Sequence, residues 1–103
     1  SATNSNPNLQ FIQAVPFKNW GATVLLAGCS ALVERLDWNG LPVLISGAGG
    51  KALTTVHNPP ISQSSFASAS QGAYWEAVVS KLSVEFICKT ATGSILDRYF
   101  QPV

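Results

Sequence analysis

LLAGCSALVERLDWNGLPVLISG, residues 25–47, contains most of the two apolar runs that decide the predicted fold. The first run extends over residues 22–28 and the second over residues 41–47, and both are rich in β-branched and aliphatic side chains. Each run is short enough for a strand that is buried on both faces. The Asn39-Gly40 pair favours positive φ and a tight reversal of the chain. Between the strands, residues 29–35 predict a loop that follows a strand end, where proteins often present metal ligands or a nucleophile.

The flanks of this stretch are less regular. Residues 1–8 are polar and rich in Asn and Ser, which predicts a flexible N-terminal arm. Residues 9–20 carry apolar side chains at a roughly helical spacing, interrupted by Pro16, and predict one or two helical turns packed on a sheet. Residues 57–72 contain many Ser and two Pro without periodicity, and predict an irregular surface excursion.

The last third of the chain predicts three further strands, at residues 73–79, 80–89 and 94–100, with a hairpin turn at residues 90–93. The expected fold class is therefore α+β and β-rich. It has about five strands, which form mainly one mixed sheet, and a short N-terminal helix. Residues 9–103 make up a single module after the N-terminal arm.

Composition limits the function. Of the 103 residues, 47% are hydrophobic and only 11% are charged, whereas an ordinary soluble domain carries about 25% charged residues. So few charges do not cover a small globule in the usual way, which predicts that part of the surface is covered by other protein subunits. The net charge of +1 without a basic run argues against nucleic-acid binding. No apolar run approaches the roughly 20 residues of a membrane-spanning helix, so we expect no transmembrane span in this chain, and a peripheral position at a membrane complex is left open.

Several separate motifs follow one another in a recognisable order. A strand ends in glycine, a Glu-Arg pair and an Asn-Gly turn follow, the next strand ends in SGAGG, and a hairpin with LDRYF closes the chain. Over roughly residues 11–101 this order resembles the C-terminal part of a calcineurin-like metallophosphoesterase of the purple-acid-phosphatase-like kind. The matching positions are Trp20-Gly21, Gly28, Glu34-Arg35, Asn39-Gly40, Ser46 to Gly50, Gly93 and Asp97.

The resemblance also shows where this sequence departs from the family pattern. In the family, a Gly-His-x-His motif supplies one imidazole to each metal of a dinuclear Fe, Zn or Mn site. Here those positions are Cys29 and Ala31, and a methyl group has no donor atom. One thiolate does not make a metal site by itself, and the family's other ligands belong to upstream motifs that these residues do not include. We therefore expect no catalytic residue, no metal site and no cofactor.

The resulting expectation is a non-catalytic, degenerate metallophosphoesterase-like module that acts as a structural or accessory subunit of a larger protein complex. The alternative is one fragment of a split or processed metal-dependent phosphoesterase whose remaining ligands come from another chain. A third reading is a small-ligand or phosphate-binding module that uses the loop at residues 47–50 without catalysis. The compartment is left open, with a lean towards a processed organellar protein, because the first residues read as an artificial boundary or as a processing site.

The remaining candidate residues favour structural roles. His57 has no acidic or cysteine neighbour in the sequence and predicts a surface histidine. The SGAGGK segment lacks the first Gly and the Ser/Thr of a phosphate loop. Glu34 and Arg35 are candidates for a structural ion pair. Cys29 and Cys88 are expected as buried thiols, with a disulfide as the alternative. Aromatic side chains are the expected partner contacts, with Trp38 first and then Trp20, Phe66 and Tyr99.

Overall fold

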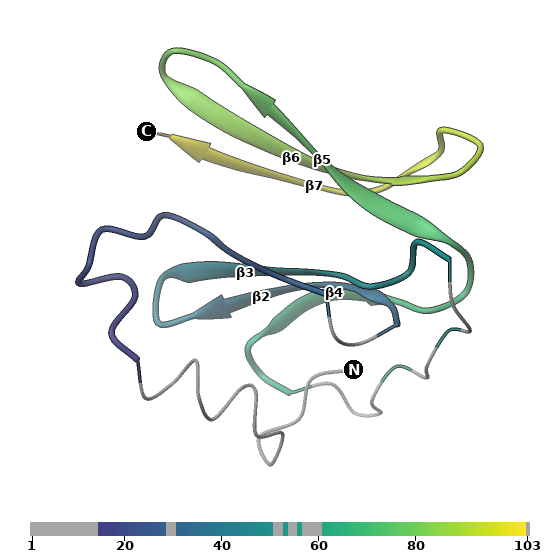
Figure 1. The fold of residues 1–103 in the computed structure, drawn as a ribbon, viewed down its shortest axis with the longest axis horizontal. Coiled ribbons are helices and arrows are strands. Elements are labelled where there is room, and N and C mark those ends of the chain that lie inside the picture. The colour runs from purple at the N-terminus through teal and green to yellow at the C-terminus, as the bar shows by residue number, and fades with distance from the viewer. Residues whose placement is uncertain (1–14, 29–30, 51–52, 54–55, 57–60, 103) are drawn as a thin grey trace.

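The computed structural model describes residues 15–28, 31–50, 53, 56 and 61–102. These residues form seven strands in two separate sheets, which lie one above the other in Figure 1. The strands are β1 (Leu25–Ala27), β2 (Val33–Trp38), β3 (Leu41–Ser46), β4 (Ser64–Ser68), β5 (Ala73–Val79), β6 (Ser83–Thr90) and β7 (Ile95–Pro102).

The first sheet has the strand order β1-β3-β2-β4. β1 runs parallel to β3, whereas β2 is antiparallel to both β3 and β4. The β2–β3 hairpin turns at Asn39 and Gly40, whose φ angles are 51° and 85°, and the side chain of Asp37 accepts a hydrogen bond of 2.7 Å from the Gly40 amide. The sequence predicted this turn correctly because Asn and Gly adopt positive φ at low cost.

The second sheet is an antiparallel meander with the order β5-β6-β7. The turn between β6 and β7 contains Gly93 at φ 89°, and its amide donates to the Thr90 carbonyl at 2.9 Å. The predicted hairpin at residues 90–93 is therefore confirmed, as is the strand at residues 73–79, which coincides with β5.

The two central strands of the first sheet, β2 and β3, are largely buried on both faces. On one face, Leu36 of β2 lies opposite Val43 of β3 in a cluster that also includes Trp38. On the other face, Val33 packs with Ala73 and with residues of the second sheet. Burial of each large aliphatic side chain stabilises the fold by about 1.5–3 kcal/mol, so these two clusters supply most of the hydrophobic stabilisation.

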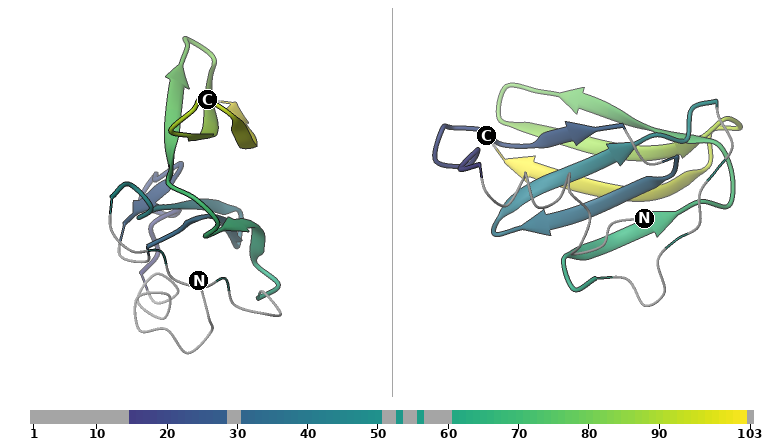
Figure 2. Two further views of the ribbon diagram at one scale, coloured as in Figure 1. Left: turned by 90° about the vertical axis from the view of Figure 1, so that its right-hand side faces the viewer. Right: turned by 60° about the horizontal axis from the view of Figure 1, so that its bottom comes forward.

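The second sheet meets the first at a steep angle, as the side view in Figure 2 shows. Trp75 of β5 fastens this joint, because its indole N–H donates to the Ile45 carbonyl at 3.1 Å. The same indole makes an edge contact with the ring of Phe66 of β4, with 6.1 Å between the ring centroids. Two strands of the first sheet thus contact one side chain of the second.

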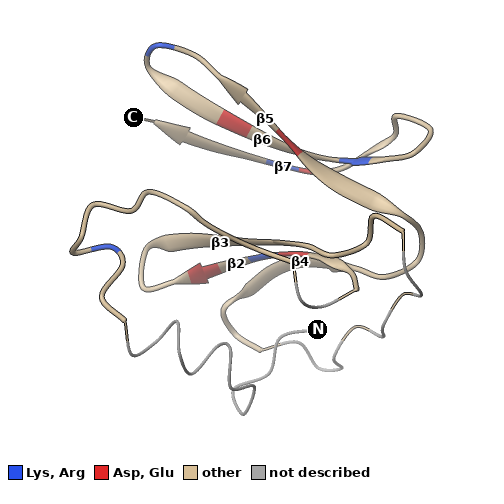
Figure 3. Cartoon of the chain, viewed as in Figure 1, with Lys and Arg blue, Asp and Glu red and all other residues tan. Residues whose placement is uncertain are grey.

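The outer face of the second sheet carries two ion pairs, and Figure 3 marks the charged residues of this sheet in blue and red along the ribbon. Lys89 contacts Glu76 at 3.2 Å and Arg98 approaches Glu85 at 3.6 Å. Ile87 lies between the two ion pairs, because it is the cross-strand partner of Glu76 on one side and of Arg98 on the other. Only 7% of its surface is exposed. The aliphatic stems of long charged side chains cover apolar surface in this way while their charged ends reach water.

The predicted α+β class is wrong for the described residues, which contain strands and turns but no α-helix. The expected helix at residues 9–20 falls partly outside the described residues, and residues 15–20 form turns instead. There, the Trp20 amide donates to the carbonyls of Pro16 and Phe17 at 3.2 and 3.1 Å, without continuing into a helix. Pro16 lacks a backbone N–H, which limits helix formation at this point.

The prediction of mainly one sheet with about five strands is also wrong, because the described residues form two sheets with seven strands. β2 occupies residues that the sequence assigned partly to a loop, and β4 lies inside the predicted irregular excursion at residues 57–72. β2 pairs with β3 across the adjacent hairpin turn and with the distant β4. Local sequence patterns do not reveal the pairing of β2 with β4.

Candidate functional site

The loop after β1 lies against the segment that follows β3. Because β1 and β3 are parallel, their carboxyl ends meet at the same edge of the sheet. A Cβ atom on Gly28 would lie 3.7 Å from the Ser46 carbonyl oxygen, and the Gly47 amide donates to the Leu32 carbonyl at 2.9 Å. The two glycine-containing motifs that the sequence separates by about 20 residues are therefore neighbours in space.

The described part of this loop offers no side-chain donor atom to a metal ion. Ala31, at the second of the two degenerate ligand positions, is buried with 1% of its surface exposed. Cys29 and His57 lie outside the described residues. Elsewhere, within the part of the chain that the structure describes, no three His, Cys, Asp or Glu side chains group closely enough to hold a metal. A dinuclear phosphoesterase requires two ions held side by side to activate water and to clamp the phosphate.

Glu34 and Arg35 separate to opposite faces of the sheet, as successive residues of a strand do. Glu34 is fully buried, and its carboxylate accepts a hydrogen bond of 2.7 Å from the Ser64 hydroxyl of β4. Arg35 pairs with Asp97 of β7, not with its chain neighbour. Its Nε atom lies 2.7 Å from one Asp97 oxygen and its Nη2 atom lies 3.4 Å from the other.

The Arg35 guanidinium also stacks over the ring of Tyr99, with 5.1 Å between Cζ and the ring centroid. The Tyr99 hydroxyl in turn donates to the Gln101 side chain at 2.7 Å. We call Arg35, Asp97 and Tyr99 the intersheet clasp. Two motifs of the family resemblance, Glu-Arg and LDRYF, therefore meet in one structural contact. The sequence did not reveal this contact, because 62 positions separate Arg35 from Asp97.

Cys88 lies beside the clasp as a free, fully buried cysteine. Burial, together with the negative charge of neighbouring Asp97, raises the pKa of the Cys88 thiol to about 11. Nucleophilic attack and metal binding both require the thiolate. At neutral pH Cys88 is therefore a small apolar core residue rather than a reactive group.

The four aromatic residues expected to contact partners lie in different environments. Trp20 is 71% exposed and touches the ring of Phe17 edge-on. Trp38, the first choice, is only 7% exposed and belongs to the core. Phe66 and Tyr99 are half-buried at the joint between the sheets. Of the four, Trp20 alone presents most of its side chain to solvent.

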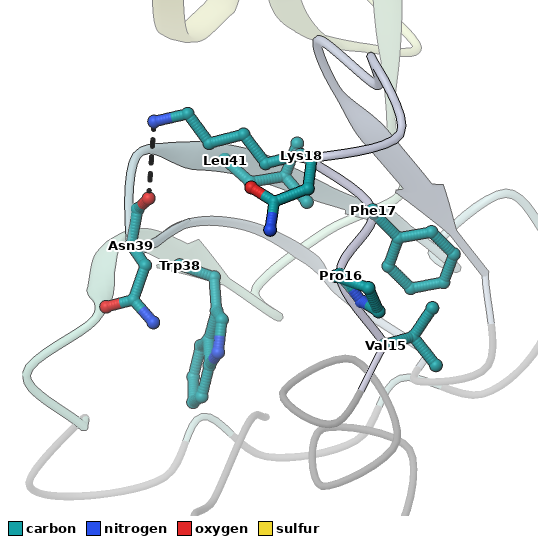
Figure 4. Close-up of a pocket in the computed structure, with 8 residues that line it drawn as sticks. Val15, Pro16, Phe17, Lys18, Trp38, Asn39 and Leu41 are labelled. Carbon is teal, nitrogen blue, oxygen red and sulfur yellow. Dashed lines mark hydrogen bonds between the residues drawn. The ribbon is translucent and has the colours of Figure 1, made fainter.

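Two cavities were not anticipated from the sequence. The first, of about 200 Å³, lies between the segment before β1 and the β2–β3 hairpin (Figure 4), and Lys18 at its rim donates to the Asn39 carbonyl at 3.5 Å. Its lining residues are Val15, Pro16, Phe17, Lys18, Asn19, Trp38, Asn39 and Leu41.

The second cavity, of about 230 Å³, lies between the two sheets. Its lining residues are Leu26, Leu44, Ser46, Trp75, Ala77 and Phe86. None of these side chains is charged. The sequence predicted that the strand containing Leu26 is buried on both faces, but β1 is an edge strand and Leu26 is 68% exposed.

Comparison with known proteins adds no family assignment, because no protein-family model matches this sequence and no curated protein matches it significantly. The described part of the chain contains no helix long and apolar enough to cross a membrane.

Proposed function

We propose that this chain is a non-catalytic, metallophosphoesterase-like module that acts as a structural or accessory subunit of a larger protein complex. The observation that carries the proposal is the buried methyl group of Ala31 at a position where the resembled family has a metal-binding imidazole. A buried alanine at the end of the loop supplies neither a donor atom nor room for a bound ion.

The intersheet clasp supports the same function. Arg35 and Asp97 stand at positions that match the resembled family, and both are engaged in joining the two sheets. A bidentate guanidinium–carboxylate pair fixes orientation as well as distance. Arg35 and Asp97 therefore stabilise the scaffold.

Exposed apolar side chains favour an assembly role. Large apolar residues that expose more than two thirds of their surface occur in both sheets, before β1 and between β5 and β6; they are Trp20, Leu26, Val79 and Leu82. Apolar surface of this kind typically marks sites where proteins associate. The low proportion of charged residues, 11%, is consistent with a surface that is partly covered by other subunits.

Activity and metal content test the proposal together. Purified protein is assayed with p-nitrophenyl phosphate, with and without added Mn²⁺ or Zn²⁺, and its metals are measured by elemental analysis. We expect no hydrolysis above the buffer rate and no stoichiometric metal. Two bound metals per chain together with metal-dependent hydrolysis would overturn the proposal in favour of a phosphoesterase fragment. The variant Cys29→His with Ala31→His is expected to remain inactive.

A further inference from the structure

The free edge of β1 and the cavity beside it form one surface. β1 pairs with β3 along one side only, and no described strand lies on its other side. Leu26, in the middle of β1, is 68% exposed and forms part of the cavity wall. The unpaired backbone groups of an edge strand attract another extended segment.

The edge of β7 is protected against such pairing. Asp97 points from β7 towards the first sheet and is held by Arg35. The β6–β7 register shifts between Cys88 and Lys89, and the strand ends at Pro102. An inward-pointing charge, a bulge and a proline are the devices that prevent strand addition. β1, with the sequence LLA, has none of the three.

The lining and the volume of the cavity indicate which kind of side chain it accommodates. Its walls are the aromatic rings of Trp75 and Phe86 and aliphatic groups, with the Ser46 hydroxyl as a polar group at the rim. An apolar cavity of about 150 Å³ is large enough to bind benzene, so about 230 Å³ accommodates one Leu or Phe side chain. Since no wall residue is charged, a charged side chain would lose its hydration without gaining an ion partner.

We propose that β1 binds an extended, uncharged strand of another polypeptide, which adds to the edge of the first sheet and inserts one Leu or Phe side chain into the cavity. This inference rests on the proposed function and specifies its partner. β1 is only three residues long, so backbone pairing supplies few hydrogen bonds and the inserted side chain provides most of the affinity.

The probe is a blocked seven-residue peptide in which Thr alternates with Val and the central residue is Leu. It is titrated into the ¹⁵N-labelled protein, and matched peptides carry Lys, Asp or N-methyl-Leu at the centre. We expect amide shifts concentrated at β1 and at the cavity walls, and binding at least tenfold weaker for each matched peptide. Absence of binding, equal affinity for the Lys peptide, or shifts centred on β5 or β7 would overturn the inference.

Two protein variants complete the test. Leu26→Lys places a charge at the cavity rim and is expected to weaken binding at least tenfold, whereas Leu82→Lys at the 75% exposed Leu82 should change it less than twofold. Both sites are exposed, so both variants should fold, which circular dichroism verifies. Free indole that binds as tightly as the Leu peptide would contradict strand addition. These readouts are independent of metal content and phosphatase activity, so a failed peptide test leaves the proposed function standing.

Discussion

The loop before β2 and the intersheet clasp in the middle of β2 differ in what their side chains do. At the loop, Ala31 presents a buried methyl group where the resembled family presents an imidazole. Four residues further on, Arg35 makes two hydrogen bonds to Asp97 and stacks on Tyr99. The polar groups of the clasp thus hold the two sheets together.

The difference shows that a resemblance carried by scaffold residues does not imply the activity of the resembled family. The Arg35–Asp97 pair depends only on the arrangement of the sheets, whereas hydrolysis also depends on donor atoms at the loop. The two regions can therefore be perturbed separately, and the predictions below do so.

The largest expected effect is that of Ala31→His. An imidazole forced into a site with 1% exposure overpacks the core and buries a polar group, so we expect the free energy of unfolding to fall by about 3 kcal/mol. Urea denaturation measures the change. The matched control, Ala91→His on an exposed turn, should change it by less than about 0.5 kcal/mol. Full stability of Ala31→His with stoichiometric Zn²⁺ bound would mean that the loop still accommodates ligands.

Removal of the clasp should have the second largest effect. Arg35→Ala leaves the Asp97 carboxylate, which is 16% exposed, without its guanidinium, and we expect a loss of about 2 kcal/mol. The matched control is Arg98→Ala, whose ion pair with Glu85 is longer and more exposed, and it should cost less than about 0.5 kcal/mol. Equal losses for the two variants would contradict a special role for the clasp, and a double-mutant cycle with Asp97→Ala isolates the pair.

Trp75→Phe should have a smaller effect. The substitution keeps a ring against Phe66 but removes the indole N–H that donates to the Ile45 carbonyl, so a loss of about 1 kcal/mol is expected. Thermal unfolding monitors the change, and Trp20→Phe at an exposed ring provides the control. If the two variants are equally stable, the indole hydrogen bond does not fasten the joint.

Cys88 should not affect how the free energy of unfolding depends on pH near neutrality. It should have a measurable effect only at alkaline pH. Its pKa is about 11 in the folded protein and 9.0 ordinarily. Between these values the unfolded thiol has lost its proton while the folded thiol keeps it, so the unfolded state binds fewer protons and stability falls as pH rises. Urea denaturation between pH 8 and about 11 should show a steeper fall for the wild type than for Cys88→Ala. Parallel curves would contradict the raised pKa.

The hairpin turns of this fold were predicted from the sequence, whereas strand β2, residues 33–38, was predicted only in part. The turns at Asn39-Gly40 and at residues 90–93 were predicted because Gly and Asn there adopt positive φ. β2 was predicted partly as a loop because it contains Glu34, Arg35 and Asp37, whose charges are unusual in a buried strand. Glu34 contacts the Ser64 hydroxyl and Arg35 contacts Asp97, which lie 30 and 62 residues away in the sequence. Only the tertiary structure brings these residues together.

β4 and the cavities were missed for a similar reason. Apart from Phe66, the residues of β4 (SSFAS) have low strand propensity. The segment forms a strand because its backbone pairs with β2. That Ala31 stands at a degenerate ligand position stays a prediction, which rests on the family resemblance. The burial of Ala31, and the cavity beside Leu26, depend on how the two sheets meet.

Native mass spectrometry of the purified protein tests the central claim most directly, because one spectrum reports both bound metals and bound subunits. The account predicts a chain without metal ions that is held in a larger assembly with other polypeptides. A stable monomer that carries two metal ions would contradict it.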